Sequence, residues 1–176
     1  CKKHHLKVVE DIKENWITLS LNNKFHALLA TDSIPEAIAY YRLLRKEMPA
    51  LKVTALFDPN IDNTGGQQFK EEGLIEVLEG YKEQFSKEFT MSTHAAFKKD
   101  VALRLAHKKP YNGKDFTEDK QINLLIVVNQ MLTGFDSKWI NTLYVDKLME
   151  YENIIQAFSR TNRLFGPDKP FGVIGY

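Results

Sequence analysis

Residues 122–128 are the part of the sequence that most restricts the fold, because they form an almost unbroken aliphatic run, Ile-Asn-Leu-Leu-Ile-Val-Val. A strand with one face in water alternates apolar and polar residues, whereas a central strand of a parallel sheet is covered on both faces. The run is also far shorter than the roughly 20 residues that cross a bilayer. We therefore expect a buried parallel strand with helices packed over it.

Strands and helices alternate along the rest of the chain. Ser33 and Glu36 have the spacing of a capping box, and Pro35 suits a first helical turn. Further strands are expected at residues 25–30, 51–57, 143–145 and 171–174. Helices are expected at residues 2–16, 34–48 and 152–162. This order predicts an α/β fold with a mostly parallel sheet and helices on both faces.

Residues 58–121 separate two of the expected strands and are longer than a plain crossover needs. Apolar residues recur at helical spacing twice in this segment, around Tyr81 and around Val101. We expect a helical insertion at one edge of the sheet. We divide the chain into a linking helix at 1–20 and one α/β domain at 21–176.

The charge balance gives no sign of a general nucleic-acid binder. Among 176 residues, 24 Lys and Arg stand against 23 Asp and Glu, a net charge of +1, so any basic surface must be local. The single cysteine, Cys1, cannot pair within the chain, which favours a reducing compartment. We expect a soluble cytoplasmic protein with no membrane partner, and a piece of a longer chain because it begins without Met.

Complete nucleotide and metal sites are missing from the sequence. No G-x-x-x-x-G-K-[ST] phosphate loop is present, and Gly113-Lys114 follows Asn112 in what we interpret as an Asn-Gly turn. The five histidines are scattered, and His4 and His5 are expected to be a solvated terminal pair. We therefore predict no metal site within the chain itself.

The helix expected near residues 151–163 has an unusual polar side. At about 100° per residue, Gln156, Ser159, Arg160 and Arg163 gather opposite the apolar side. Helix physics alone favours a solvated face whose arginines complement the helix dipole. The alternative is an anion-binding face, because this side holds no acidic residue to neutralise the two guanidinium groups.

The loop after the aliphatic strand is a second candidate site. Thr133, Gly134 and Asp136 follow that strand, and open α/β sheets bind ligands at the carboxyl ends of their strands. Here a hydroxyl, a free backbone N–H and a carboxylate can meet a ligand. An ordinary Thr-Gly turn with Asp136 as a helix cap is at least as good an interpretation of this loop alone.

Together these segments resemble superfamily 2 helicases and translocases. Residues 156–163, Gln-Ala-Phe-Ser-Arg-Thr-Asn-Arg, resemble motif VI, Q-x-x-G/S-R-x-x-R, with Ser159 where many relatives have Gly. The aliphatic strand and the Leu-Thr-Gly-Phe-Asp at 132–136 resemble motif V, and residues 25–33 resemble motif IV. With Asn-Thr-Leu-Tyr-Val-Asp-Lys at 141–147, the pattern is similar to the restriction (R) subunit of type I restriction–modification enzymes.

The resemblance implies that the chain is the second RecA-like lobe of a motor. ATP and Mg²⁺ would then be held mainly by a preceding lobe, and none would be bound by this chain alone. Arg163 would be the arginine finger, Arg160 a second γ-phosphate contact, and Gln156 part of the γ-phosphate and water network. A guanidinium group suits this role because it offers planar, bidentate donors and stays protonated.

The same resemblance assigns roles to residues of the other motifs. Asp136 would lie near the ribose or bridge to motif VI, and Gly134 would relay between ATP and the nucleic acid. Thr133, Thr31 and Ser33 would contact the DNA backbone. Thr31 and Ser33 lie at a helix N-terminus, which suits a phosphate. A helix cap is the simpler explanation for Ser33.

The function implied by the resemblance is ATP-dependent translocation of double-stranded DNA before cleavage by a type I site-specific deoxyribonuclease. The implied partners are double-stranded DNA, specificity and methylation subunits, and the preceding motor lobe and nuclease domain, in a bacterial or archaeal cytoplasm. The isolated chain would be inactive. Two alternatives stay open: the second lobe of another superfamily 2 DNA or RNA helicase, and a non-catalytic α/β interaction module.

Overall fold

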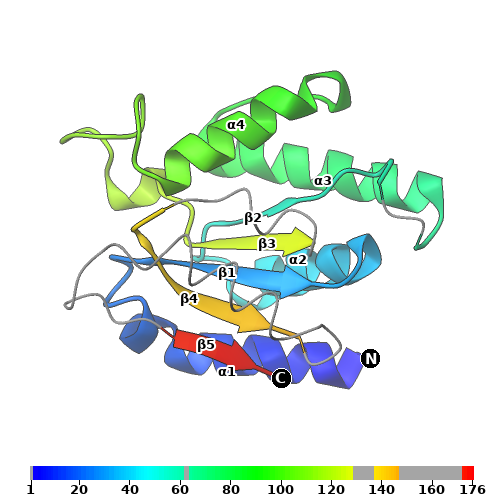
Figure 1. Ribbon diagram of the computed structural model, residues 1–176, viewed down its shortest axis with the longest axis horizontal. Coiled ribbons are helices and arrows are strands. Elements are labelled where there is room, and N and C mark those ends of the chain that lie inside the picture. Colours follow the sequence, from blue (N-terminus) through cyan, green and yellow to red (C-terminus); the bar gives the residue numbers. More distant parts are fainter. Residues whose placement is uncertain (1, 62–63, 129–136, 147–171) are drawn as a thin grey trace.

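The aliphatic run at residues 122–128 forms a central strand of a five-stranded parallel sheet (Figure 1). The computed structural model describes residues 2–61, 64–128, 137–146 and 172–176. Its strands are β1 (His26–Thr31), β2 (Val53–Leu56), β3 (Leu124–Val128), β4 (Ile140–Val145) and β5 (Gly172–Gly175). Their order is β2-β3-β1-β4-β5, and each neighbouring pair is parallel. This confirms the expected α/β, RecA-like fold class.

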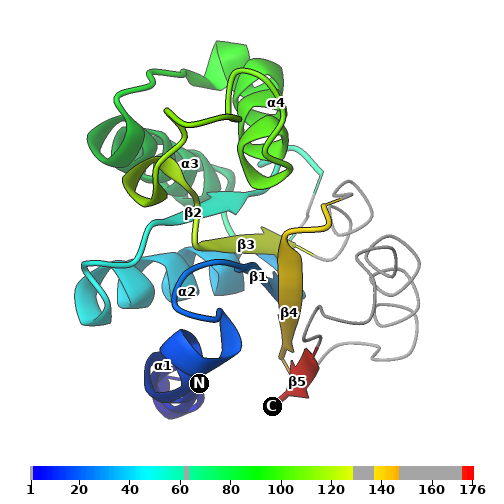
Figure 2. The ribbon, with the colours of Figure 1, turned by 90° about the vertical axis from the view of Figure 1, so that its left-hand side faces the viewer.

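Two helices cover one face of this sheet, α1 (Lys2–Leu19) and α2 (Ile34–Glu47) (Figure 2). Ser33 caps α2, because its hydroxyl oxygen accepts a hydrogen bond from the backbone N–H of Glu36 at 3.3 Å. Apolar residues of both helices join the strands in one core, among them Ile12 and Trp16 of α1. The helix expected at 152–162 lies outside the described residues.

The segment between β2 and β3 forms two longer helices, α3 (Gln67–Phe85) and α4 (His94–Leu105), and two short 3-10 helices, Met91–Thr93 and Glu118–Lys120. In both views α3 and α4 lie beyond β2, at one edge of the sheet (Figures 1 and 2). The side-chain amide of Gln84 accepts from the N–H of Val53 at 3.0 Å and donates to its carbonyl at 2.9 Å. This amide therefore pairs with the outer edge of β2 as the backbone of another strand would.

A buried charge holds the two insertion helices together. Arg104 is 3% exposed, and its guanidinium lies 4.0 Å from the ring centroid of Tyr111 and 4.4 Å from that of Phe85. It pairs with the buried carboxylate of Asp100 at 3.4 Å and donates to the hydroxyl of Tyr81 at 2.9 Å. Rings and hydrogen bonds thus replace the water that the guanidinium loses on burial.

The bounds of the strands differ from the expected ones by one to three residues, and β4 and β2 differ most. β4 begins at Ile140 rather than at residue 143, and β2 is limited to Val53–Leu56. The start of β4 was missed because Asn141 and Thr142 are polar, whereas the prediction looked for apolar residues. Both are nevertheless buried. The amide of Asn141 donates to the carbonyl of Leu19 at 2.7 Å, which satisfies it inside the fold.

No helix in the described ranges combines the length and apolar character that spanning a bilayer requires.

Candidate functional site

The carboxyl ends of three neighbouring strands define the candidate edge of the sheet. In the parallel registers Thr31 of β1 pairs with Val128 of β3, and Ala30 pairs with Val145 of β4. β3 and β4 therefore end at the same edge, one on each side of β1, and residues 129–136 and 147–171 come after them in the sequence. In open α/β sheets this is the edge at which ligands bind.

Six predicted site residues belong to these two segments and lie outside the described residues. They are Thr133, Gly134, Asp136, Gln156, Arg160 and Arg163. Their roles stay predictions that rest on the motif resemblance.

The two remaining predicted residues, Thr31 and Ser33, lie at the described part of this edge. Thr31 is fully buried, and its hydroxyl donates to the carbonyl of Val127 at 2.9 Å. Ser33 is also buried and caps α2. Both hydroxyl groups are thus engaged within the fold. The predicted contact of Thr31 and Ser33 with the DNA backbone stays a prediction.

A group of titratable side chains at the same edge was missed by the sequence prediction. His5 of α1 lies 2.5 Å from the carboxylate of Glu36 in α2, measured from Nε2 to Oε2. His4 lies 3.2 Å from Asp146, which directly follows β4, and the hydroxyl of Tyr40 donates to the same carboxylate at 2.8 Å. The expectation that His4 and His5 are a solvated pair is therefore wrong, since both side chains are partly buried against carboxylates.

The sequence alone points to one member of this group and not to the others. Asp146 follows a strand at its carboxyl end, which marks it as a site candidate from sequence. The histidines offer no such signal, because His4 and Asp146 are 142 residues apart in the chain. Packing of α1 on the sheet brings them together.

Burial sets the protonation of Tyr40 in this group. Desolvation raises the pKa of the Tyr40 hydroxyl far above its usual value, and its hydrogen bond to Asp146 raises the pKa further. The hydroxyl therefore stays protonated and serves as a fixed donor to the carboxylate.

The opposite edge of the sheet holds a different histidine pair. Nε2 of His26 and Nε2 of His107 are 2.7 Å apart, and the His107 ring stacks on Trp139 with centroids 4.3 Å apart. Burial lowers the pKa of His26 to about 3 and that of His107 to about 4, with a smaller contribution from His107 to the former and from Lys138 to the latter. Both rings are therefore neutral at pH 7.

A groove of about 700 Å³ lies near this opposite edge, with residues of both α1 and α2 in its wall. Trp16, Ile17 and Met48 contribute apolar surface, and Lys52 and Asn123 stand just before β2 and β3. Its position at the amino ends of the strands separates it from the candidate edge.

Comparison with known proteins matches nearly the whole chain to one family. The family model described as type I restriction enzyme subunit R domain 3 covers residues 23–176. A type I restriction enzyme endonuclease subunit from Staphylococcus aureus strain MRSA252 is 35% identical over 175 residues, which covers 95% of this chain. The corresponding subunit from Staphylococcus saprophyticus is 36% identical over 174 residues and also covers 95% of this chain.

Similarity extends to an archaeal protein, and all of these relatives are several times longer than this chain. A putative endonuclease subunit from Methanocaldococcus jannaschii is 28% identical over 169 residues, covering 96% of this chain and 13% of that protein. This chain spans 18% of the length of each staphylococcal relative.

Proposed function

The chain belongs to the family of type I restriction enzyme R subunits, in the region described as domain 3, and from this premise we propose that it is the second RecA-like motor lobe of such a subunit. In this role it takes part in ATP-dependent translocation along double-stranded DNA, which precedes cleavage. The relatives are named only as endonuclease subunits of type I restriction enzymes. The motor role is our inference from the residues discussed below.

One observation carries the proposal. The motif V residues belong to 129–136, which follows β3 in the sequence, and the motif VI residues belong to 147–171, which follows β4 after Asp146; β3 and β4 are the two neighbours of β1. A parallel sheet directs the chain out of both strands at the same edge, next to the N-terminus of α2. That edge is where an open α/β sheet binds ligands, and a helix N-terminus there favours anionic groups.

The chemistry of the donor set fits a triphosphate held against this lobe. Arg163 and Arg160 supply two guanidinium groups, and Gln156 supplies an amide, with no acidic side chain on that face of the sequence pattern. Guanidinium groups bind phosphate oxygens in a planar, bidentate manner and stabilise the charge that spreads over a transferred phosphoryl group. Asp136 and Gly134 would then contact the nucleotide side, and Thr133, Thr31 and Ser33 the DNA backbone.

The proposal includes parts that this chain lacks. ATP and Mg²⁺ would be held mainly by a first motor lobe in the same polypeptide, which also carries the nuclease domain. Specificity and methylation subunits would complete the enzyme in a bacterial or archaeal cytoplasm. Because half of the ATP site is elsewhere, we expect no ATP hydrolysis and no nuclease activity from this 176-residue chain alone.

Substitution of the proposed arginine finger tests the motor role. In the intact R subunit, Arg163→Ala should leave ATP affinity nearly unchanged and lower DNA-stimulated ATP turnover by about 10³–10⁵-fold, the range seen for arginine fingers. Translocation, measured as displacement of a third DNA strand from a triplex downstream, should fall in parallel. Arg163→Lys should restore little, since an ammonium group lacks the bidentate geometry.

The matched control is Arg42→Ala, which removes an exposed arginine paired with Glu76 at 2.8 Å. It should keep normal turnover. Normal turnover in the Arg163→Ala protein would contradict the motor role and favour an interaction module. Stimulation of the intact subunit by RNA in place of double-stranded DNA would favour another superfamily 2 helicase.

A further inference from the structure

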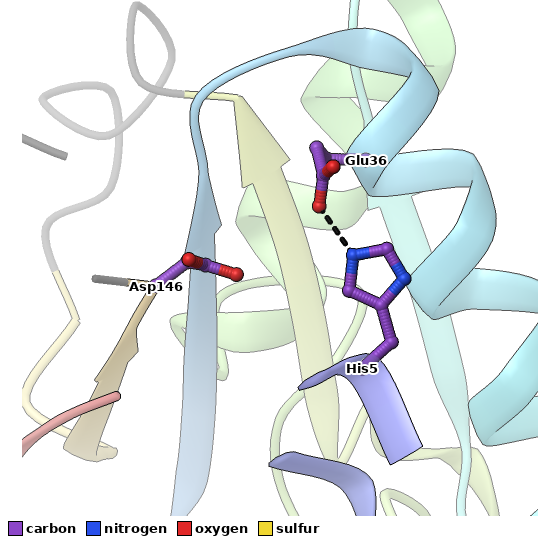
Figure 3. A group of neighbouring side chains, drawn as sticks. All are labelled: His5, Glu36 and Asp146. Carbon is purple, nitrogen blue, oxygen red and sulfur yellow. Dashed lines mark hydrogen bonds and ion pairs between the residues drawn. The ribbon is translucent and has the colours of Figure 1, made fainter. Parts of the chain in front are cut away.

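Three ligand atoms from three separate elements converge at the candidate edge of the sheet. His5 comes from α1, Glu36 from the first turn of α2, and Asp146 from the end of β4. Their nitrogen and oxygen atoms all lie within 4.8 Å of one another. Figure 3 shows the imidazole and the two carboxylates directed into the same space.

The charges in this group favour a bound cation. Two carboxylates that share a space repel each other, and the imidazoles of His4 and His5 beside them offset this charge only when they are protonated. Asp146 is buried, with 7% of its side chain exposed, so water screens its charge poorly. Divalent transition metal ions are commonly bound in proteins by an imidazole together with carboxylates.

The spacing of the ligand atoms suits a small ion after modest side-chain motion. Zinc binds imidazole nitrogen and carboxylate oxygen at about 2.0–2.2 Å, which puts neighbouring ligand atoms of a tetrahedron about 3.4 Å apart. The present separations bracket this value, from 2.5 Å between His5 and Glu36 up to the 4.8 Å limit of the group. Side-chain rotations of His5 and Glu36 alone adjust them, because both are partly exposed.

We propose that His5, Glu36 and Asp146 form a binding site for one divalent transition metal ion, with zinc as the ion that fits the ligand set best. His4 is within reach of the fourth position, since its Nε2 is 3.2 Å from Oδ2 of Asp146. Imidazole nitrogens with carboxylate oxygens select zinc over magnesium or calcium, which prefer ligand sets made of oxygen alone.

Tyr40 supports two of the three ligands. Its hydroxyl donates to Asp146 at 2.8 Å, and its ring centroid lies 4.6 Å from that of His5. Partners of this kind orient metal ligands, and their loss typically lowers metal affinity about 10- to 100-fold. Since Asp146 directly precedes the segment 147–171, the ion would fix α1 and α2 to the point where that segment begins.

Cobalt provides the direct test, because Co²⁺ in a tetrahedral site absorbs visible light and is displaced by Zn²⁺. The probe is Co²⁺ alone, titrated into the intact R subunit after treatment with a chelator. We expect one equivalent per polypeptide to produce the visible bands and one equivalent of Zn²⁺ to remove them. His5→Ala and Asp146→Asn should each weaken this binding by more than about 100-fold, and Tyr40→Phe by about 10- to 100-fold.

Two further variants keep the test independent of misfolding. Glu36→Cys should retain the ion and add a strong near-ultraviolet thiolate-to-cobalt band, which a purely structural role of Glu36 would not produce. Glu76→Gln removes a carboxylate from the exposed pair with Arg42 and should leave Co²⁺ binding unchanged. The proposal is overturned if the unsubstituted subunit and the His5→Ala subunit bind Co²⁺ equally, or if Glu36→Cys adds no thiolate band. In either outcome the group consists of two histidine–carboxylate pairs without a metal.

Discussion

Replacing Arg104 by methionine should lower the free energy of unfolding by about 3 kcal/mol, the lower end of the 3–5 kcal/mol that breaking a buried ion pair costs. The substitution keeps most of the apolar stem and removes the guanidinium. Asp100, with 9% of its side chain exposed, then loses its buried cation. We expect the lower end because the hydroxyl groups of Tyr81 and Tyr111 still donate to Asp100, and because Lys87 lies 3.8 Å away.

Urea denaturation followed by circular dichroism measures this change, and an exposed arginine supplies the reference. Arg42 makes three hydrogen bonds to Glu76, but 48% and 42% of the two side chains are exposed. Arg42→Met should therefore cost no more than about 1 kcal/mol. Combining Arg104→Met with Asp100→Asn should recover part of the loss, because the uncompensated charge is gone. Equal costs for Arg104→Met and Arg42→Met would refute the assignment of Arg104 as a buried structural charge.

Two further predictions concern close packing and acid stability. A Cβ on Gly80 would lie 1.9 Å from the Tyr41 hydroxyl, so Gly80→Ala should destabilise the chain by about 1–2 kcal/mol despite its better helix propensity. Gly172→Ala, whose added Cβ would meet no atom within 4 Å, should be nearly neutral in the same denaturation assay. With pKa values of about 3 and 4, His26 and His107 bind protons only in the unfolded chain between pH 6.5 and pH 5, so stability should fall over this range. The fall in the free energy of unfolding between pH 6.5 and pH 5 should be about 2 kcal/mol smaller in the His26→Phe protein than in the unsubstituted protein. An equal fall in the two proteins would contradict the assignment of His26 and His107 as a neutral pair.

Local physics made most of the secondary structure predictable. The run in β3 is apolar throughout because both faces are buried, and Ser33 caps α2 as its spacing with Glu36 indicates. The start of β4 was not predictable, since Asn141 is polar and finds its partner, the Leu19 carbonyl, 122 residues away. The pattern of apolar residues in a sequence indicates only where apolar side chains are buried. It therefore does not predict a buried polar residue whose hydrogen-bond partner is distant in the chain.

The candidate site also has a part that the sequence indicated and a part that it did not. Motif spacing pointed to Arg160, Arg163 and Asp136 without any knowledge of the fold, and these roles stay predictions. The carboxylate of Glu36 was expected to complete a capping box, but in the structure it contacts His5. That contact depends on how α1 packs across α2, and no short-range pattern in the sequence carries this information.

The pairing of Gln84 with β2 determines where the sheet stops. An unpaired strand edge is a template on which another extended chain can assemble, and long exposed edges lead to aggregation. One amide already occupies both backbone positions of Val53, and the helix that carries it lies across the approach. A foreign strand would have to displace Gln84 before it could align with β2. The insertion thus shields the sheet from unwanted polymerisation at β2, whose four residues are all buried and, apart from Thr54, apolar.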